Sequence, residues 1–525
     1  MRRISTIILT VAFVAAAFSA FAAETTFSGT YRIRAYSEYN FDKKIEDNNF
    51  SGLPGHENAQ YDGWFDQRFR LTITHKRSEY LKAVVRLDLV EDTWGQQRNL
   101  WINNNNFGNY IDLAYIEFTV PKIGTFTVGK FPETYGHGLA FSDEGNDPSG
   151  GFLLGPFISS GPIGLTGARW ANSWGPVSAS LLYAKVADRM TFVIPIPSLY
   201  NWDADLFAIN LKVAPTDDHV IELFGGYLQD NEAFLGCFFN SFSWLNYLDA
   251  WVFLLPAFYS ADVGFAGIAY TGNIADMIDI KFENSYIMGH AHRHLWTAIP
   301  FPLIGGPFYP QPTLTIQGYN IYADVSYYND LLRIGVAFIM GSGQHHLWNS
   351  ASMKNINMNY ISQDDFTFNQ ILVNGGSGTN SVYGLGSSLF GKNSIENITA
   401  VKLYFEICPI EKLTLTASVT WAEWTEDVGI NFAGTRAALV TSKGSAYSHP
   451  AYFYGNNLYE SWDTSDDLGW EVDFGFSYEI MEGLTYSFNM GVLFTGDSWD
   501  YEKADGTRGE WGEIWSITNS LVYEF

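Results

Sequence analysis

The sequence predicts a transmembrane antiparallel β-barrel of about eighteen strands, and three observations support this fold class. The chain of 525 residues is 17% aromatic but only 16% charged, whereas soluble globular proteins are about 25% charged. Its mean hydropathy is −0.05, which is too low for a bundle of membrane helices. Apolar residues instead alternate with small and polar ones over segments of about ten residues, as in barrel strands between lipid and a wet lumen.

The charge balance excludes one class of partner. The chain has 30 basic and 56 acidic residues, a formal net charge of −26 and a pI near 4.6. Electrostatic binding to the phosphates of nucleic acid needs a basic surface. The sequence has no such surface, so we exclude nucleic acid as a partner.

Residues 1–23 are predicted to be a cleaved signal peptide. Two arginines at the start precede an apolar run at 7–18, and small residues at 20–22 suit a signal peptidase. The alternative is a buried N-terminal helix. We therefore expect an exported protein with a single barrel domain over residues 24–525.

Alternation with a period of two defines the predicted strands. In the first, 27–38, Phe27 and Tyr31 share one face while Arg32 and Arg34 share the other. The strands in order are 27–38, 65–74, 81–89, 110–120, 124–130, 166–174, 176–187, 204–214, 218–229, 261–272, 276–289, 315–328, 331–341, 396–408, 411–424, 468–480, 483–496 and 513–525. Eighteen is an even number, as bacterial barrels require, and sixteen is the alternative count.

The connections between these strands alternate between short and long. Short turns fall at 76–79, 121–123, 175–176, 215–218, 272–276, 329–330, 409–410 and 481–482, and the long connections include 41–64, 131–165, 230–260, 341–395 and 426–467. Short periplasmic turns and long extracellular loops are typical of outer-membrane barrels. This regularity predicts the cell outer membrane as the location.

The last predicted strand ends on Phe525, with Tyr523, Leu521 and Ile517 on the same face. A terminal aromatic residue on an alternating strand looks like the signal that the barrel assembly machinery reads. The predicted partners therefore include that machinery, through Phe525, and outer-membrane lipid.

Motifs between residues 27 and 139 resemble the alginate-export family of porin-like outer-membrane barrels. They are QRFRL at 67–71, KAVVRLDL at 82–89, IDLAYIEF at 111–118, TFTVGKF at 125–131 and the Tyr135-Gly136 pair. In that family, arginines of the first strands attract an anionic polysaccharide into the lumen. Arg32, Arg34, Arg68 and Arg70 stand at matching positions, Lys130 stands where arginine is more usual, and Asp112-Leu113 replaces an Arg-Glu pair.

Basic residues of the early strands are the candidate lumen residues. They are Arg32, Arg34, Arg68, Arg70, Lys82, Arg86 and Lys130. Asp66 and Asp88 fall on the same face, with Glu38 near the rim. Lumen charges set the selectivity of a channel, so the bases predict a ladder for anionic solutes. The alternative is a network of ion pairs that braces the barrel wall, and the sequence leaves both open.

The loop predicted at 131–165 is rich in glycine and proline and has an acidic centre. Its constriction candidates are Asp143, Glu144 and Asp147, because a loop folded into the lumen would place these carboxylates in the path of solutes. Carboxylate oxygens also bind calcium, and a solvated acidic turn is the third interpretation.

Three histidines, His290, His292 and His294, alternate at the end of a predicted strand, so their side chains share a face. Imidazoles at this spacing bind transition metals, but no further ligand is evident and histidines at a rim are usually solvated. We therefore predict no metal and no cofactor.

Two predicted loops, 234–259 and 295–309, are rich in aromatic residues. Large exposed apolar patches usually mark an interface or a ligand groove. These loops cap the barrel mouth with a small core of their own, contact a partner or a sugar chain, or contact the outer leaflet of the membrane.

The expected function is a porin or channel for diffusion or export of polar and anionic solutes, or of a polysaccharide. The alternatives are a structural or partner-binding barrel and an enzyme active at the rim. The sequence contains no nucleophile elbow, zinc-protease helix motif or phosphate-binding glycine loop, and only His137 near Asp143 resembles a catalytic pair. We therefore expect no enzyme.

Overall fold

The computed structural model describes residues 24–39, 61–93, 111–139, 142–143, 165–188, 203–230, 257–295, 313–342, 368–373, 398–425, 465–499, 501–502, 508–510 and 512–525. Among these, no helix is long and apolar enough to cross a bilayer. The predicted signal peptide, Glu144, Asp147 and nearly all of the two aromatic loops lie outside the described residues.

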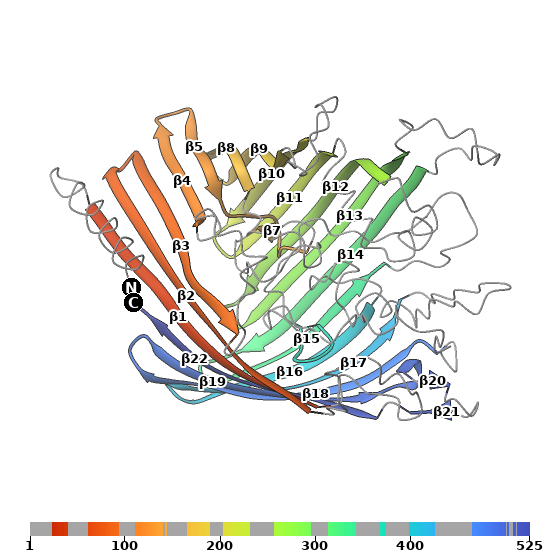
Figure 1. Ribbon diagram of the computed structural model, residues 1–525. Coiled ribbons are helices and arrows are strands. Elements are labelled where there is room, and N and C mark those ends of the chain that lie inside the picture. The colour runs from red at the N-terminus through yellow and green to blue at the C-terminus, as the bar shows by residue number, and fades with distance from the viewer. Residues whose placement is uncertain are drawn as a thin grey trace, which may run out of the picture.

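Eighteen antiparallel strands form one closed barrel (Figure 1). They are β1 (Glu24–Tyr39), β2 (Tyr61–Ser78), β3 (Leu81–Thr93), β4 (Ile111–Val120), β5 (Gly124–Phe131), β8 (Leu165–Trp174), β9 (Val177–Asp188), β10 (Asp203–Thr216), β11 (His219–Asp230), β12 (Ala257–Ile274), β13 (Ile278–Leu295), β14 (Thr313–Tyr328), β15 (Leu332–Gly341), β16 (Ile398–Ile410), β17 (Leu413–Trp424), β18 (Asp467–Met481), β19 (Leu484–Thr495) and β22 (Glu513–Glu524). The predicted fold class and the count of eighteen are confirmed.

Four shorter strands and one helical turn complete the described elements. They are β6 (Glu133–Thr134) paired with β7 (Ser142–Asp143), β20 (Tyr501–Glu502) paired with β21 (Arg508–Gly509), and the 3-10 turn η3 (Asp497–Trp499).

Pairing of the first strand with the last closes the barrel. Tyr31 of β1 lies opposite Tyr523 of β22 on one side and opposite Phe69 of β2 on the other. Phe525 continues this ladder, since its backbone oxygen accepts from Gly29 N at 3.0 Å and its N–H donates back at 3.1 Å. The terminal residue therefore belongs to the seam, while its role as an assembly signal stays a prediction.

Some strands extend further than the sequence predicts. Residues 257–259, assigned to an aromatic loop, begin β12, and Leu295, assigned to the next loop, ends β13. The two ends pair directly, with Ala257 opposite Leu295. The backbone ladder continues past the part of a strand that alternation marks, because pairing satisfies backbone donors and acceptors whatever the side chains are.

Apolar side chains cover the outside of the barrel. On β10, Phe207 and Ile209 are 49% and 52% exposed, whereas Leu206, Ala208 and Asn210 between and beside them are buried. The same alternation places exposed leucine, valine and aromatic residues all around the outside of the barrel. An exterior of this kind is stable only in lipid, and the closed antiparallel barrel is located in the outer membrane.

The short turns, the start of β1 and the end of β22 all lie at the same end of the barrel. Glu24 at the start of β1 pairs with Lys76, beside the turn that joins β2 to β3. At the other chain end, Glu524 N donates to Gly483 O at 2.7 Å in the turn between β18 and β19. The end with the short turns is the periplasmic side expected from the loop lengths.

Candidate functional site

Most predicted ladder residues are bound to carboxylates on neighbouring strands. Arg34 donates to both oxygens of Asp66, with Nη2 at 2.6 Å from Oδ2. Arg70 Nε donates to Asp88 Oδ1 at 2.6 Å, and both side chains are buried. These pairs support the bracing interpretation for Arg34 and Arg70.

The same arrangement continues along the wall. Arg86 Nε donates to Asp112, which also lies 3.9 Å from Arg70 Nε. Lys82 pairs with Glu117 at 2.8 Å, and Lys130 Nζ donates to the backbone oxygen of Ile111 at 3.2 Å. Asp112 stands where the motif of the alginate-export family has a basic residue. It forms ion pairs with both Arg86 and Arg70.

Arg32 differs from these bases. It lies directly opposite Arg68 across the β1–β2 ladder, and Arg34 is two residues further on. Among the described residues its buried Nε has no hydrogen-bond partner. Asp66 is bound to Arg34, and on its other side Arg68 lies opposite Glu91 of β3. Like charges directly opposite one another, as Arg32 and Arg68 are, destabilise a sheet.

Residues 132–139, which we call the inward loop, leave β5 and enter the lumen. Tyr135 is fully buried, with its ring centroid 5.9 Å from that of Phe224 on β11. Gly136 N donates to Glu222 at 2.9 Å, and His137 N donates to Glu283 at 2.5 Å. Since β11 and β13 lie several strands away from β5, the inward loop crosses part of the lumen.

A glycine is required where the inward loop meets the wall. Gly136 has φ +60°, a left-handed conformation. A Cβ at this position would lie 2.7 Å from Glu283 Oε2. The close approach lets the loop backbone donate to two wall carboxylates at once.

The titratable groups of the inward loop lie outside the membrane-spanning strands. Burial raises the pKa of Glu133, and the charge of Arg169 opposes this shift. Arg169 Nη1 donates to Glu133 Oε2 at 2.5 Å. Burial lowers the pKa of His137, and the ring Nε2 lies 3.3 Å from the backbone oxygen of Tyr270. Burial therefore favours the uncharged form of His137.

The inward loop is the start of the acidic segment predicted at 131–165. The described carboxylate that it brings into the lumen is Glu133, which the sequence prediction did not single out. The backbone of Asp143 pairs with Glu133, but its side chain, Glu144 and Asp147 lie outside the described residues. Their role in a constriction stays a prediction.

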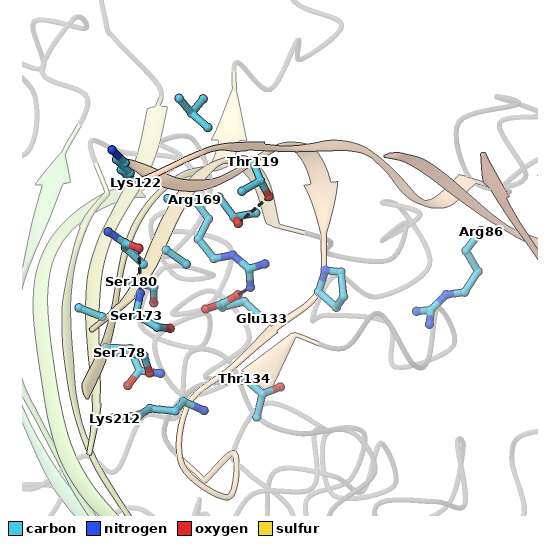
Figure 2. A pocket seen from close by; sticks show the side chains of 18 residues that line it. Arg86, Thr119, Lys122, Glu133, Thr134, Arg169, Ser173, Ser178, Ser180 and Lys212 are labelled. Carbon is cyan, nitrogen blue, oxygen red and sulfur yellow. Dashed lines mark hydrogen bonds and ion pairs between the residues drawn. The ribbon is translucent and has the colours of Figure 1, made fainter. Parts of the chain in front are cut away.

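A cavity of about 820 Å³ lies between the inward loop and the short-turn end of β3 to β10 (Figure 2). The charged side chains among its described lining residues are Arg86, Lys122, Arg169, Lys212 and Glu133. Most of the other lining side chains carry a hydroxyl or an amide: Thr119, Thr125, Thr134, Asn172, Ser173, Ser178, Ser180 and Asn210.

The basic side chains reach the surface of this cavity, whereas two of their carboxylate partners lie behind it. Asp112, which binds Arg86, is fully buried and does not line the cavity. Glu222, which binds Lys212 at 3.0 Å, is also buried behind the surface. Figure 2 shows Arg169 and Glu133 pointing toward one another, with Lys212 and Arg86 on other sides of the space.

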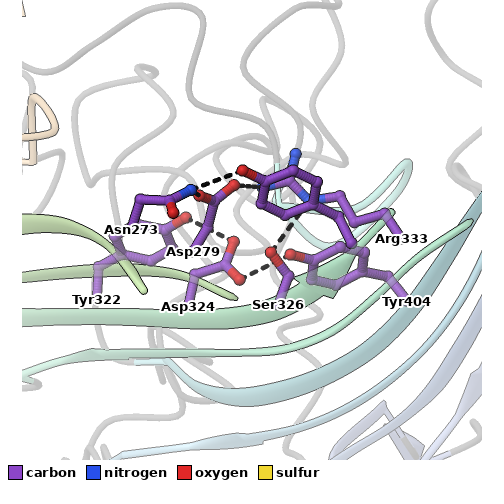
Figure 3. Close-up of polar contacts among 8 residues, drawn as sticks. Asn273, Asp279, Tyr322, Asp324, Ser326, Arg333 and Tyr404 are labelled. Atoms are coloured by element: carbon purple, nitrogen blue, oxygen red, sulfur yellow. Dashed lines mark hydrogen bonds and ion pairs between the residues drawn. The ribbon is translucent and has the colours of Figure 1, made fainter. Parts of the chain in front are cut away.

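A second polar network lies on β12 to β16 (Figure 3). Arg333 Nη2 donates to Asp279 at 2.8 Å, and Asn273 Nδ2 donates to the same carboxylate at 2.9 Å. Tyr404 and Tyr322 donate to Asp324 at 2.7 and 3.2 Å. Both carboxylates are thus satisfied from the wall itself, which fits a bracing role.

The three predicted rim histidines lie on β13. The side chain of His290 is exposed, and the side chains of His292 and His294 lie outside what the structure describes. Among the described residues, no three histidine, cysteine, aspartate or glutamate side chains gather as metal ligands.

No family model matches the chain, and no curated protein matches it. Its resemblance to the alginate-export family is therefore not confirmed. Solved structures similar to the chain include Pseudomonas aeruginosa OpdQ, with 9% identity, 95% of this chain and 98% of that one covered, and a TM-score of 0.42. Another is Pseudomonas aeruginosa OccK2 (OpdF) in complex with glucuronate, with 10% identity, 96% of each chain covered and a TM-score of 0.44. OmpT of Vibrio cholerae has 10% identity, 97% and 99% coverage and a TM-score of 0.35.

Proposed function

We propose that this barrel is an outer-membrane channel for small polar solutes with a preference for anions. The cavity beside the inward loop is the observation that carries the proposal. Its lining combines four basic side chains with one acidic one, and its remaining surface is rich in hydroxyl groups. Such a surface binds the charge of an anionic solute and replaces the water around its polar groups.

The net charge of the protein does not oppose this preference. The chain carries −26 overall, but a charge is screened beyond about 8 Å at physiological ionic strength. A solute in the lumen is therefore influenced by the nearest side chains. Along β1 and β2 these include Arg32, Arg34 and Arg68, with Asp66 bound to Arg34 and Glu91 of β3 opposite Arg68.

Current through planar bilayers tests the proposal. In a salt gradient, the reversal potential of the purified barrel should indicate preference for chloride over potassium. A Glu133→Gln, Arg169→Gln double variant is the matched control, because it removes one charge of each sign from the cavity. A barrel that passes no current, or one that prefers potassium, would contradict the proposal.

Export of a polysaccharide is the narrower hypothesis, and the motif resemblance at residues 27–139 supports it. A short uronate and a long polyuronate distinguish the two cases. Passage of both would favour a polysaccharide channel. Passage of the short anion alone would restrict the function to small solutes. A non-conducting barrel would instead favour the structural and enzymatic alternatives.

A further inference from the structure

Residues 368–373, which we call the inner strap, lie inside the barrel against β16 to β22. At one end, Lys402 on β16 donates to the backbone oxygen of Phe368. Two residues further on, Gln370 Nε2 donates to Thr518 Oγ1 on β22 at 2.8 Å. Phe368 N donates to Val373 O at 2.9 Å, so the strap is a closed turn, and its side-chain contacts reach from β16 to β22 on the lumen face of the wall.

One carboxylate holds the centre of the inner strap. Glu471 projects inward from β18 and is 0% exposed. Its Oε1 accepts from Ile371 N at 2.6 Å and its Oε2 accepts from Leu372 N at 2.9 Å. Both oxygens of one carboxyl group are used, so a single side chain satisfies two neighbouring backbone donors of the strap. Removal of this side chain leaves two buried backbone donors without an acceptor.

Apolar packing surrounds this polar anchor. Ile371, Leu372 and Val373 are at most 1% exposed. They belong to one buried cluster with inward-facing wall residues, which are Ala337, Ile339, Ile398, Ala400, Ala422, Trp424, Leu468, Leu493 and Ile514. These wall residues lie toward the strand ends opposite to the short turns. Leu139 of the inward loop is part of the same cluster, so the inward loop and the inner strap share one buried apolar contact inside the lumen.

A glycine on the lumen face of the wall leaves room for the inner strap. Gly491 on β19 faces the lumen, and a Cβ there would lie 2.8 Å from the Cβ of Gln370. The wall position therefore accepts the strap only when it carries no side chain. Contacts with Lys402, Glu471, Gly491 and Thr518 therefore hold the strap at four positions of the wall.

We propose that the inner strap closes the β15–β22 side of the lumen and that Glu471 is the positioning residue that keeps it closed. Solutes then pass on the β3–β10 side, along the basic cavity, and the strap sets the upper size of solute that the channel admits. This inference rests on the proposed channel function. Glu471 acts through the strap and need not touch a solute.

Replacement of Glu471 should widen the channel. In Glu471→Ala, we expect a single-channel conductance roughly twice that of the unchanged barrel or more, because conductance follows the open cross-section of the lumen. Uncharged sugars too large for the unchanged barrel should enter vesicles that contain the variant. Glu406→Ala is the matched control, since Glu406 faces the lumen from β16 near the short turns and loses the same side chain. It should keep the original size limit.

A second variant leaves Glu471 in place. Gly491→Ala puts a Cβ 2.8 Å from that of Gln370, so it should push the strap from β19 and raise conductance and size limit as Glu471→Ala does. Gly264→Ala on β12 is its control, because a Cβ there would meet nothing closer than 3.8 Å, and it should leave both unchanged.

The outcomes separate the two proposals. If the unchanged barrel passes no current, the channel function itself fails. If it conducts but Glu471→Ala has the same conductance and size limit as Glu406→Ala, the strap does not close the lumen. If Gly491→Ala keeps the conductance and size limit of Gly264→Ala, the strap does not lie on β19, and the inference is overturned as well.

Discussion

At the scale of single residues, the difference between Arg32 and Arg70 lies in what faces each guanidinium. Arg70 is buried against Asp88, with Asp112 next to it. Arg32 faces Arg68 and neighbours Arg34. Strand periodicity places both arginines on the lumen face, but it does not say which strand-to-strand partner each one meets. That depends on register, which a single strand does not encode.

Replacement of Arg70 should destabilise the barrel. Arg70→Gln leaves Asp88 buried without its partner, and loss of one member of a buried ion pair costs about 3–5 kcal/mol. Urea unfolding in lipid vesicles, followed by tryptophan fluorescence, measures this loss. The double variant Arg70→Gln, Asp88→Asn should cost clearly less than the single one. Equal costs would show that the pair does not brace the wall.

Arg32→Gln should change selectivity instead. Removal of one of three clustered arginines lowers the positive potential in the lumen, so the reversal potential should move toward that of cations. The unfolding free energy should stay the same or rise, because repulsion from Arg68 is relieved. Arg32→Lys keeps the charge and should keep the selectivity. An unchanged reversal potential in Arg32→Gln would remove Arg32 from the selectivity ladder.

At the scale of elements, the strands could be predicted and the inner segments could not. Alternation marks a strand wherever one face meets lipid, and it located all eighteen barrel strands. It gives no sign that Ile339, Leu493 and Ile514 face the lumen as apolar residues. They do so because the inner strap covers them, a contact between segments far apart in the chain. For the same reason Glu133 and Glu471 were not singled out as site residues.

Two glycines test the position of the inward loop. Gly136 and Gly175 both have φ +60°, but a Cβ at Gly136 would approach Glu283 at 2.7 Å, whereas one at Gly175 meets nothing within 4 Å. Alanine at either position adds backbone strain of about 1–3 kcal/mol. Only Gly136→Ala should also push the loop from the wall and change single-channel conductance. Equal conductance in the two variants would mean that the loop contact does not shape the path.

At the scale of the whole molecule, the barrel is a polar interior inside an apolar sheet. Its ion pairs lie on the lumen face, where Arg34, Arg70 and Arg86 each meet an acid from the next strand. Its outer face carries exposed apolar side chains, as the lipid-facing surface of a barrel does. The effect of a charged side chain on the stability of the barrel therefore depends on which face it occupies. On the outer face it also depends on how deep in the bilayer the side chain lies.

Lysine at two outward positions measures that depth dependence. Ile209 lies at the middle of β10 and is 52% exposed, whereas Ile123 lies in the turn between β4 and β5 and is 55% exposed. A lysine at the bilayer midplane costs about 2–4 kcal/mol, and near the interface about 0–1 kcal/mol. Ile209→Lys should therefore lower the unfolding free energy in vesicles far more than Ile123→Lys, although both side chains are equally accessible. If the two variants unfold at the same denaturant concentration, the middle of β10 does not face the hydrocarbon core, and the orientation of the barrel in the membrane is wrong.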